Sequence, residues 1–148
     1  IDVCNLLREN LQRIGVVCNV RPLESTVAAS KLLRHDFQAH FGGWSTGADP
    51  DTSVNIFGTG EGRNFGNYSS AEVDRLYDEA KREFDFEERR KLYAAIQMEL
   101  WKDQPYTWLF HQNAYAAFSK ELRGYTFSPR GPFSFGPGLS SVYKPSAL

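Results

Sequence analysis

The chain opens with a helical pattern of apolar residues that gives way to an extended one. Apolar side chains recur every three to four residues over 3–14, which predicts an amphipathic helix, and Gly15 stands where a helix C-cap belongs. Apolar and polar residues then alternate over 16–20, as in a half-buried strand, and Pro22 ends the alternation.

The next segment repeats this order. Ser25 or Thr26 is placed to cap a short helix through Leu33. Residues 37–44 alternate again and predict a second strand. Helix, strand, helix and strand in succession indicate an α/β fold.

Two stronger helical patterns occupy the middle of the chain. Ser69 forms a capping box with Glu72, and Asp85 caps a second helix with Glu88 three residues on. The predicted buried stripes are Val73, Leu76, Tyr77 and Ala80 in the first helix, and Leu92, Tyr93, Ile96 and Leu100 in the second. Pro105 prevents the second helix from continuing.

The remaining chain is aromatic and then rich in glycine and proline. Residues 106–110 read as a strand, and 114–118 as a further one. The tail, 113–148, lacks a stripe of its own on which to bury its aromatic side chains. We therefore expect it to pack poorly or on a surface outside this chain. Its aromatic residues include Phe127, Phe133, Phe135 and Tyr143.

The stretch 36–68 carries the clearest binding signal. Its strand pattern ends at Gly42 and Gly43, Trp44 follows, and a long polar loop begins. A large aromatic beside small polar groups on a loop held by a strand suits a ligand cleft. A core tryptophan followed by an ordinary turn is the alternative, and spacing alone does not separate the two.

Composition narrows the class of protein. The 148 residues suit one domain with a single core, and 17 basic against 18 acidic residues leave a net charge of -1 without a basic stripe. This argues against nucleic acid or an anionic membrane as partner. The sequence contains no run of about twenty apolar residues, which is the length that a membrane-spanning helix needs. Cys4 and Cys18 allow one disulfide, but two buried free thiols are the simpler interpretation.

No catalytic or metal-binding pattern stands out, and no cofactor motif is present. The three histidines are far apart and fit no metal spacing. Asp49 and Asp51 flank Pro50, where an aspartate commonly bonds its own turn. The glycines of GTGEG at 58–62 lack the Lys-Ser/Thr and the helix start of a phosphate loop.

Several motifs together resemble a known family. They are GWSTGADPD at 43–51, Phe57, Asn64, Tyr68, SSAEVDRLYDEA at 69–80, FEERRKLYAAIQMELWKDQPYTWLF at 86–110 and ELRGYTF at 121–127. In this order they resemble the C-terminal part of family 5 extracellular solute-binding proteins, the peptide, nickel and opine receptors of ABC importers.

The resemblance implies a fragment of a longer, periplasmic-binding-protein-like protein of type II. Residues 1–112 would form the α/β C-terminal lobe, and 113–148 would pack on a missing N-terminal lobe. It implies a non-enzymatic, substrate-binding component of an ABC importer. Such a protein captures a small, oligopeptide-like solute between its lobes and delivers it to membrane permease subunits. The implied location is periplasmic, or extracellular and membrane-anchored.

The resemblance also implies a set of ligand-binding residues. They are Trp44, Ser45, Thr46, Asp49 and Trp108. Peptide-binding members often carry an Asp three residues after this Trp, where the chain has Gly47, so the anchoring of a peptide amine is in question. For Trp108, a core position is an equal alternative. Asn64 and Tyr68 match the family pattern, but we expect them to hold the loop and the next helix rather than to contact a ligand.

Two other functions remain open at this stage. A ligand-sensing domain of a regulator uses the same module, and a DNA-binding segment upstream would reveal it. A hydrolase using Asp49 or Asp51 would need a second acid or base in the same pocket. Peptides, opines, nickel chelates and oligosaccharides all remain candidate ligands.

Overall fold

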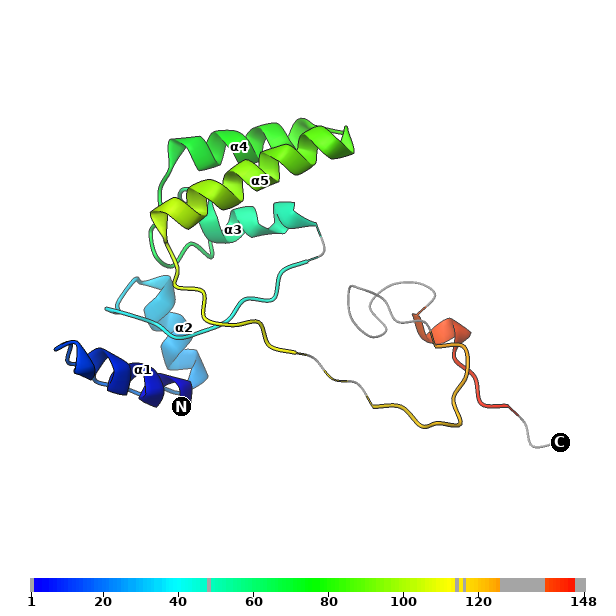
Figure 1. The fold of residues 1–148 in the computed structure, drawn as a ribbon, viewed down its shortest axis with the longest axis horizontal. Coiled ribbons are helices and arrows are strands. Elements are labelled where there is room, and N and C mark those ends of the chain that lie inside the picture. The colour runs from blue at the N-terminus through cyan, green and yellow to red at the C-terminus, as the bar shows by residue number, and fades with distance from the viewer. Residues whose placement is uncertain (1, 48, 114, 116, 126–137, 146–148) are drawn as a thin grey trace. The chain divides into compact units, whose positions relative to one another are not determined.

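The computed structural model describes residues 2–47, 49–113, 115, 117–125 and 138–145. The chain forms two compact units, which are described separately. The first comprises Ile1–Thr46 and Asp51–Pro105, and the second comprises Gly47–Pro50 and Tyr106–Leu148 (Figure 1).

The core of the first unit lies between helices α4 (Ala71–Arg82) and α5 (Phe86–Asp103). They lie side by side, and the short α3 (Val54–Phe57) lies next to α5 (Figure 1). The buried core residues are Val73, Leu76, Tyr77, Ala80, Tyr93, Ile96 and Leu100, with Leu92 partly buried against them. Both predicted stripes are therefore confirmed.

The caps of these helices agree with the sequence at one position and differ at another. Asp85 caps α5 as predicted, accepting hydrogen bonds from the backbone N–H groups of Glu87 and Glu88 at 3.0 Å. The prediction for α4 is wrong by one residue, because Ser70 is the N-cap. The Ser69 hydroxyl instead accepts a hydrogen bond from Thr59 at 3.2 Å.

Helices α1 (Asp2–Arg13) and α2 (Ser25–Leu33) confirm the first two helical patterns, and neither has a fully buried residue. Gly15 follows α1 with φ +82°, as a C-cap glycine should. The N-cap of α2 is Glu24, not Ser25 or Thr26. Its carboxylate accepts hydrogen bonds from the side chains of Thr26 and Ser25 and from nearby backbone N–H groups, which lower its pKa to about 2.

The predicted strands are not formed in the described part of the chain. Segments 16–20, 37–44 and 106–110 lie outside any helix but pair with no neighbouring strand, and the described residues of 114–118 are likewise irregular. An alternating pattern specifies one face of a strand, whereas a strand also needs a partner backbone. The structure described is helical and irregular, so the α/β prediction is not confirmed.

The loop predicted over 45–68 contains regular structure that the sequence did not reveal. A 3-10 turn, η1 (Pro50–Ser53), leads into α3, and Ile56 of α3 is buried. Elements this short show no hydrophobic period, so pattern analysis misses them.

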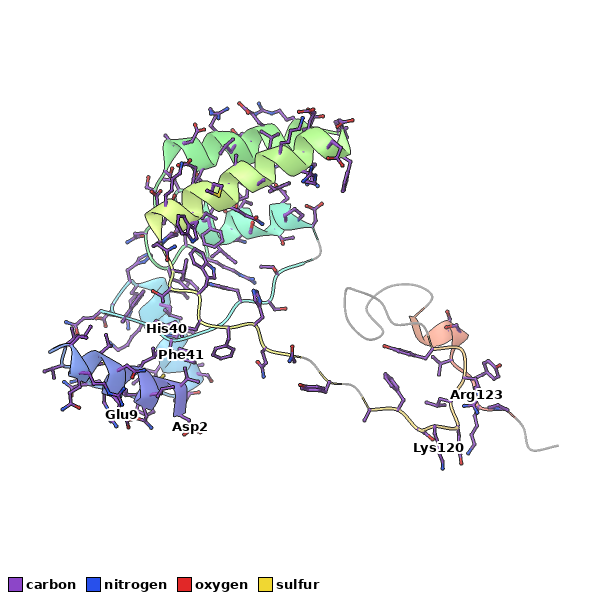
Figure 2. The ribbon with its side chains drawn as sticks, in the orientation of Figure 1. Asp2, Glu9, His40, Phe41, Lys120 and Arg123 are labelled. Atoms are coloured by element: carbon purple, nitrogen blue, oxygen red, sulfur yellow. The ribbon has the colours of Figure 1, made fainter. Side chains whose placement is uncertain are left out.

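The second unit contains a single backbone bridge among its described residues, between Arg123 and Tyr143. Two N–H···O bonds of 2.9 and 3.0 Å form it, and η2 (Gly138–Ser141) precedes Tyr143 in the chain. Gly124 has φ +76°, and a Cβ there would lie 1.9 Å from the Ser141 carbonyl oxygen, so the turn requires glycine. Figure 2 labels Lys120 and Arg123 in this unit.

Several sequence predictions concern single residues or the tail. Cys4 and Cys18 are free thiols, as the simpler interpretation of the sequence predicted, but both are half-buried rather than fully buried. Phe127, Phe133 and Phe135 lie outside the described residues, while Tyr143 is exposed. The division at 112/113 and the packing of the tail on another lobe stay predictions. Among the described helices, none is long and apolar enough to cross a membrane.

Candidate ligand-binding site

The five predicted site residues fall in two parts of the structure. Trp44, Ser45 and Thr46 end the extended segment that follows α2, in the first unit, whereas Asp49 and Trp108 belong to the second. All five are exposed, Trp44 to 38% and Trp108 to 52%. Trp44 is therefore not sealed in the core. Whether the 45–49 loop faces a cleft stays a prediction.

Trp44 rests on an aromatic residue that the sequence analysis did not select. The ring centroids of Trp44 and Phe65 lie 5.3 Å apart, with 31° between the ring planes. Phe65 is half-buried in the glycine-containing turn before α4. Tilted aromatic pairs at this separation are favourable, so the contact stabilises this arrangement of the two rings. The only sequence signal for Phe65 was an aromatic residue between Asn64 and Gly66. The sequence around it gave no indication that it contacts Trp44.

Asn64 fixes the turn that carries Phe65. Its side chain is 4% exposed, and its amide donates to the carbonyl oxygens of Gly58 at 2.9 Å and Tyr68 at 2.7 Å. Its Oδ1 accepts a hydrogen bond from the Tyr68 N–H at 2.9 Å. One side chain thus satisfies three backbone groups. The prediction that Asn64 holds this loop is confirmed.

Tyr68 connects the same turn to the end of α5. Its hydroxyl donates to Asp103 Oδ2 at 2.6 Å. Burial of the ring, and then this hydrogen bond, raise the pKa of Tyr68 to about 12. The phenol is therefore neutral in ordinary buffers and holds the loop as a hydrogen-bond donor.

A third connection reaches the turn from α2. His35 Nδ1 lies 2.9 Å from the carbonyl oxygen of Phe65. Because a carbonyl oxygen only accepts, this nitrogen carries the proton. The extended segment that runs from His35 towards Trp44 carries His40 and Phe41, labelled in Figure 2.

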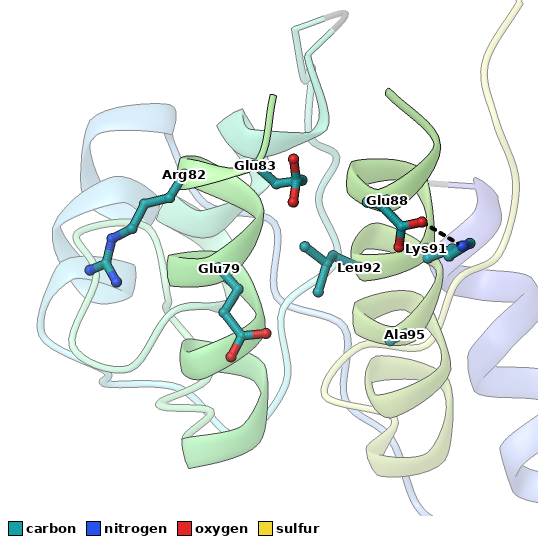
Figure 3. A pocket seen from close by; sticks show the side chains of 7 residues that line it. All are labelled: Glu79, Arg82, Glu83, Glu88, Lys91, Leu92 and Ala95. Atoms are coloured by element: carbon teal, nitrogen blue, oxygen red, sulfur yellow. Dashed lines mark hydrogen bonds and ion pairs between the residues drawn. The ribbon is translucent and has the colours of Figure 1, made fainter. Parts of the chain in front are cut away.

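Two surface hollows of the described residues lie away from the predicted site. The larger, of about 490 Å³, is an open groove between α4 and α5 (Figure 3). Its lining residues are Glu79, Arg82, Glu83, Glu88, Lys91, Leu92 and Ala95. Glu88 pairs with Lys91 at 2.7 Å within the groove. The smaller hollow, of about 200 Å³, lies beside α3 and α4.

The carboxylate proposed for catalysis at position 51 has a structural contact. Asp51 Oδ1 accepts a hydrogen bond from the hydroxyl of Tyr93, a core residue of α5, at 3.2 Å. Within the part of the chain that the structure describes, no three His, Cys, Asp or Glu side chains are grouped to hold a metal ion. The predicted site residues carry indole, hydroxyl and carboxylate groups, and their role in ligand binding stays a prediction.

No protein-family model matches the sequence, but several curated proteins and solved structures are similar to it. The chain is 31% identical over 134 residues to the oligopeptide-binding protein AppA of Bacillus subtilis, across 87% of this chain and 24% of that protein. It is 27% identical over 129 residues to the probable D,D-dipeptide-binding periplasmic protein DdpA of Escherichia coli, across 82% of this chain and 25% of that protein. It is also 27% identical over 137 residues to the heme-binding protein A of Haemophilus influenzae, across 90% of this chain and 25% of that protein.

The solved structure of Bacillus subtilis AppA in complex with a nonapeptide is similar in fold. Its TM-score is 0.77 at 27% identity, across 98% of this chain and 29% of that chain. The chain spans about a quarter of the length of the curated relatives it matches. These matches show that, over most of its length, the chain is homologous to the family 5 extracellular solute-binding proteins of ABC transporters.

Proposed function

We propose that this chain is part of the substrate-binding component of an ABC importer, which captures a peptide-like solute and delivers it to a membrane permease. The observation that carries the proposal is the similarity, across 98% of the chain, to a protein whose structure holds a nonapeptide. Sequence similarity to oligopeptide- and dipeptide-binding proteins supports the same ligand class. Such components act outside the cytoplasmic membrane, in the periplasm or anchored to the cell surface.

In the proposed protein, the chain contributes to an α/β lobe of a two-lobe fold. Segments 16–20, 37–44 and 106–110 would become strands on pairing with chain segments beyond this sequence. Exposed apolar side chains support this, because Val17 is 84% exposed and Phe41 is 42% exposed. Pairing with a larger sheet and its covering helices would bury such side chains.

The proposed ligand contacts are Trp44, Ser45, Thr46, Asp49 and Trp108. A solvent-exposed tryptophan backed by Phe65 offers a fixed apolar surface for a peptide side chain. The hydroxyls of Ser45 and Thr46 supply hydrogen bonds to a peptide backbone, and Asp49 supplies a carboxylate for a positively charged group. All five are accessible, as ligand-contacting residues must be before the ligand arrives.

The proposed mechanism is capture by lobe closure, and no bond is made or broken. A ligand that contacts both lobes binds the closed form more tightly than the open form, so it shifts the population towards closure. The permease would then recognise the closed form. Because binding alone does this work, no acid, base or nucleophile is required of Asp49 or Asp51.

Calorimetry on the full-length protein tests this proposal. The titrants are a panel of short peptides, an opine and hemin, and we expect saturable binding of peptides only. Trp44→Ala should weaken peptide binding by roughly tenfold to thirtyfold, as losing a buried aromatic anchor does. Trp101→Ala is the matched control, because Trp101 is 67% exposed on α5 and outside the proposed site. Binding of hemin or the opine without peptide binding would overturn the peptide assignment.

A further inference from the structure

Helices α1 and α2 end in the same hydrogen-bonded motif, and the first of them shows its usual form. The N–H of Val16 donates to the carbonyl oxygen of Leu11 at 3.0 Å, and that of Gly15 donates to Gln12 at 3.0 Å. This crossed pair of bonds requires a left-handed residue after the helix, and Gly15 supplies it with φ +82°. Glycine adopts this conformation without steric cost.

Helix α2 repeats the motif with a histidine at the left-handed position. The N–H of Asp36 donates to the Lys31 carbonyl oxygen at 2.9 Å, and that of His35 donates to Leu32 at 3.0 Å. His35 has φ +54°, a conformation unfavourable for a residue with a Cβ. A residue with a Cβ at such a position raises the question of what its side chain contributes.

The side chain of His35 makes a long-range contact with the turn before α4. Its Nδ1 donates to the carbonyl oxygen of Phe65, thirty residues along the chain, at 2.9 Å. The Phe65 ring in turn lies against Trp44, with centroids 5.3 Å apart. Asn64 holds the other side of the same turn through three hydrogen bonds. The backbone of Phe65 is therefore held from both sides.

We propose that His35 is a positioning residue that fixes the orientation of Trp44 through Phe65. In this proposal the histidine holds the Phe65 backbone, and the Phe65 ring supports the Trp44 indole. The indole is therefore already ordered when the ligand binds. Ordering before binding raises affinity, because less conformational entropy is lost on association. The link to affinity rests on the proposed peptide-binding function, whereas the ordering of Trp44 does not.

Two substitutions at position 35 separate this role from a purely structural one. His35→Gly keeps the left-handed backbone and removes the side chain. His35→Asn keeps a nitrogen donor at the position of Nδ1, and asparagine tolerates the left-handed region better than most residues. Phe65→Leu keeps an apolar side chain but removes the ring that supports Trp44.

Time-resolved fluorescence anisotropy of Trp44, without ligand, is the first test. It uses the full-length protein with Trp101→Phe and Trp108→Phe as background, so that Trp44 is the only tryptophan of this chain. Any tryptophans elsewhere in the full-length protein are also replaced by Phe. We expect His35→Gly and Phe65→Leu to increase the fast, local motion of the indole, and His35→Asn to restore the slow decay. Unchanged local motion in both His35→Gly and Phe65→Leu would overturn the proposal.

The second test is calorimetry with a peptide that the unsubstituted full-length protein binds. Here each His35 variant carries no other substitution. We expect His35→Gly to weaken binding by about threefold to tenfold while the urea midpoint stays the same or rises, and His35→Asn to restore the affinity. Equal losses of affinity and stability in both His35 variants would make His35 merely structural. A protein that binds no peptide at all would refute the proposed function instead, and the anisotropy would still decide whether His35 orders Trp44.

Discussion

Replacing Asn64 by alanine should destabilise the first unit far more than the loss of an ordinary asparagine. The side chain is 4% exposed and makes three hydrogen bonds of 2.7 to 2.9 Å to backbone groups of Gly58 and Tyr68. Each such bond contributes about 0.5–1.5 kcal/mol, and buried groups left without partners add to the loss. We therefore expect Asn64→Ala to lower the free energy of unfolding by about 2–4 kcal/mol.

Urea unfolding followed by circular dichroism measures this loss. Asn64→Asp is the informative companion, because it conserves volume but replaces the donating amide nitrogen by a carboxylate oxygen that faces the carbonyl oxygens of Gly58 and Tyr68. It should destabilise the protein at neutral pH at least as much as Asn64→Ala. Asn10→Ala on the exposed side of α1 should change stability by less than about 0.5 kcal/mol. If Asn64→Ala behaved like Asn10→Ala, the turn before α4 would not depend on this side chain.

Two further predictions concern the core and the pH dependence. Ile96 is 2% exposed between α4 and α5, so Ile96→Ala should lower the free energy of unfolding, measured in urea, by about 2–4 kcal/mol. Met98 is exposed, so Met98→Ala should change this free energy little, and equal effects of the two substitutions would contradict the core assignment. The pKa of Tyr68 is raised from 10 to about 12 in the folded chain, so the unfolded chain loses this proton first and stability should fall as pH rises through that interval. Tyr68→Phe should remove part of that fall in alkaline unfolding experiments, and an unchanged pH profile would refute it.

The sequence predicted α4 and α5 well because their information is local. The apolar stripes of both helices recur every three to four residues, and the Asp85 cap lies next to the helix that it begins. Both signals are local in sequence, so they can be predicted without tertiary context. The cap of α4 could not be assigned to one residue from the sequence, because Ser69 and Ser70 are chemically identical. In the structure Ser70 Oγ accepts a hydrogen bond from the Val73 N–H at 3.3 Å, while Ser69 contacts Thr59.

The strand segments and the support of Trp44 were not predictable in the same way. Alternation over 16–20 and 37–44 states that a segment could lie in a sheet, but it cannot supply the partner strand. The pairing of Trp44 with Phe65 joins residues far apart in sequence, and the histidine that holds Phe65 carries no motif. The resemblance to a family indicated Trp44 as a site residue; the structure adds the residues that support it.

Comparing the full-length protein with this 148-residue chain tests the central claim most directly. Both are titrated with the same peptide in a calorimeter. If the chain supplies only part of a two-lobe site, the full-length protein should bind the peptide in a saturable, one-to-one manner, and the chain alone should bind far more weakly or not at all. Equal affinities for the chain and the full-length protein would contradict capture between two lobes.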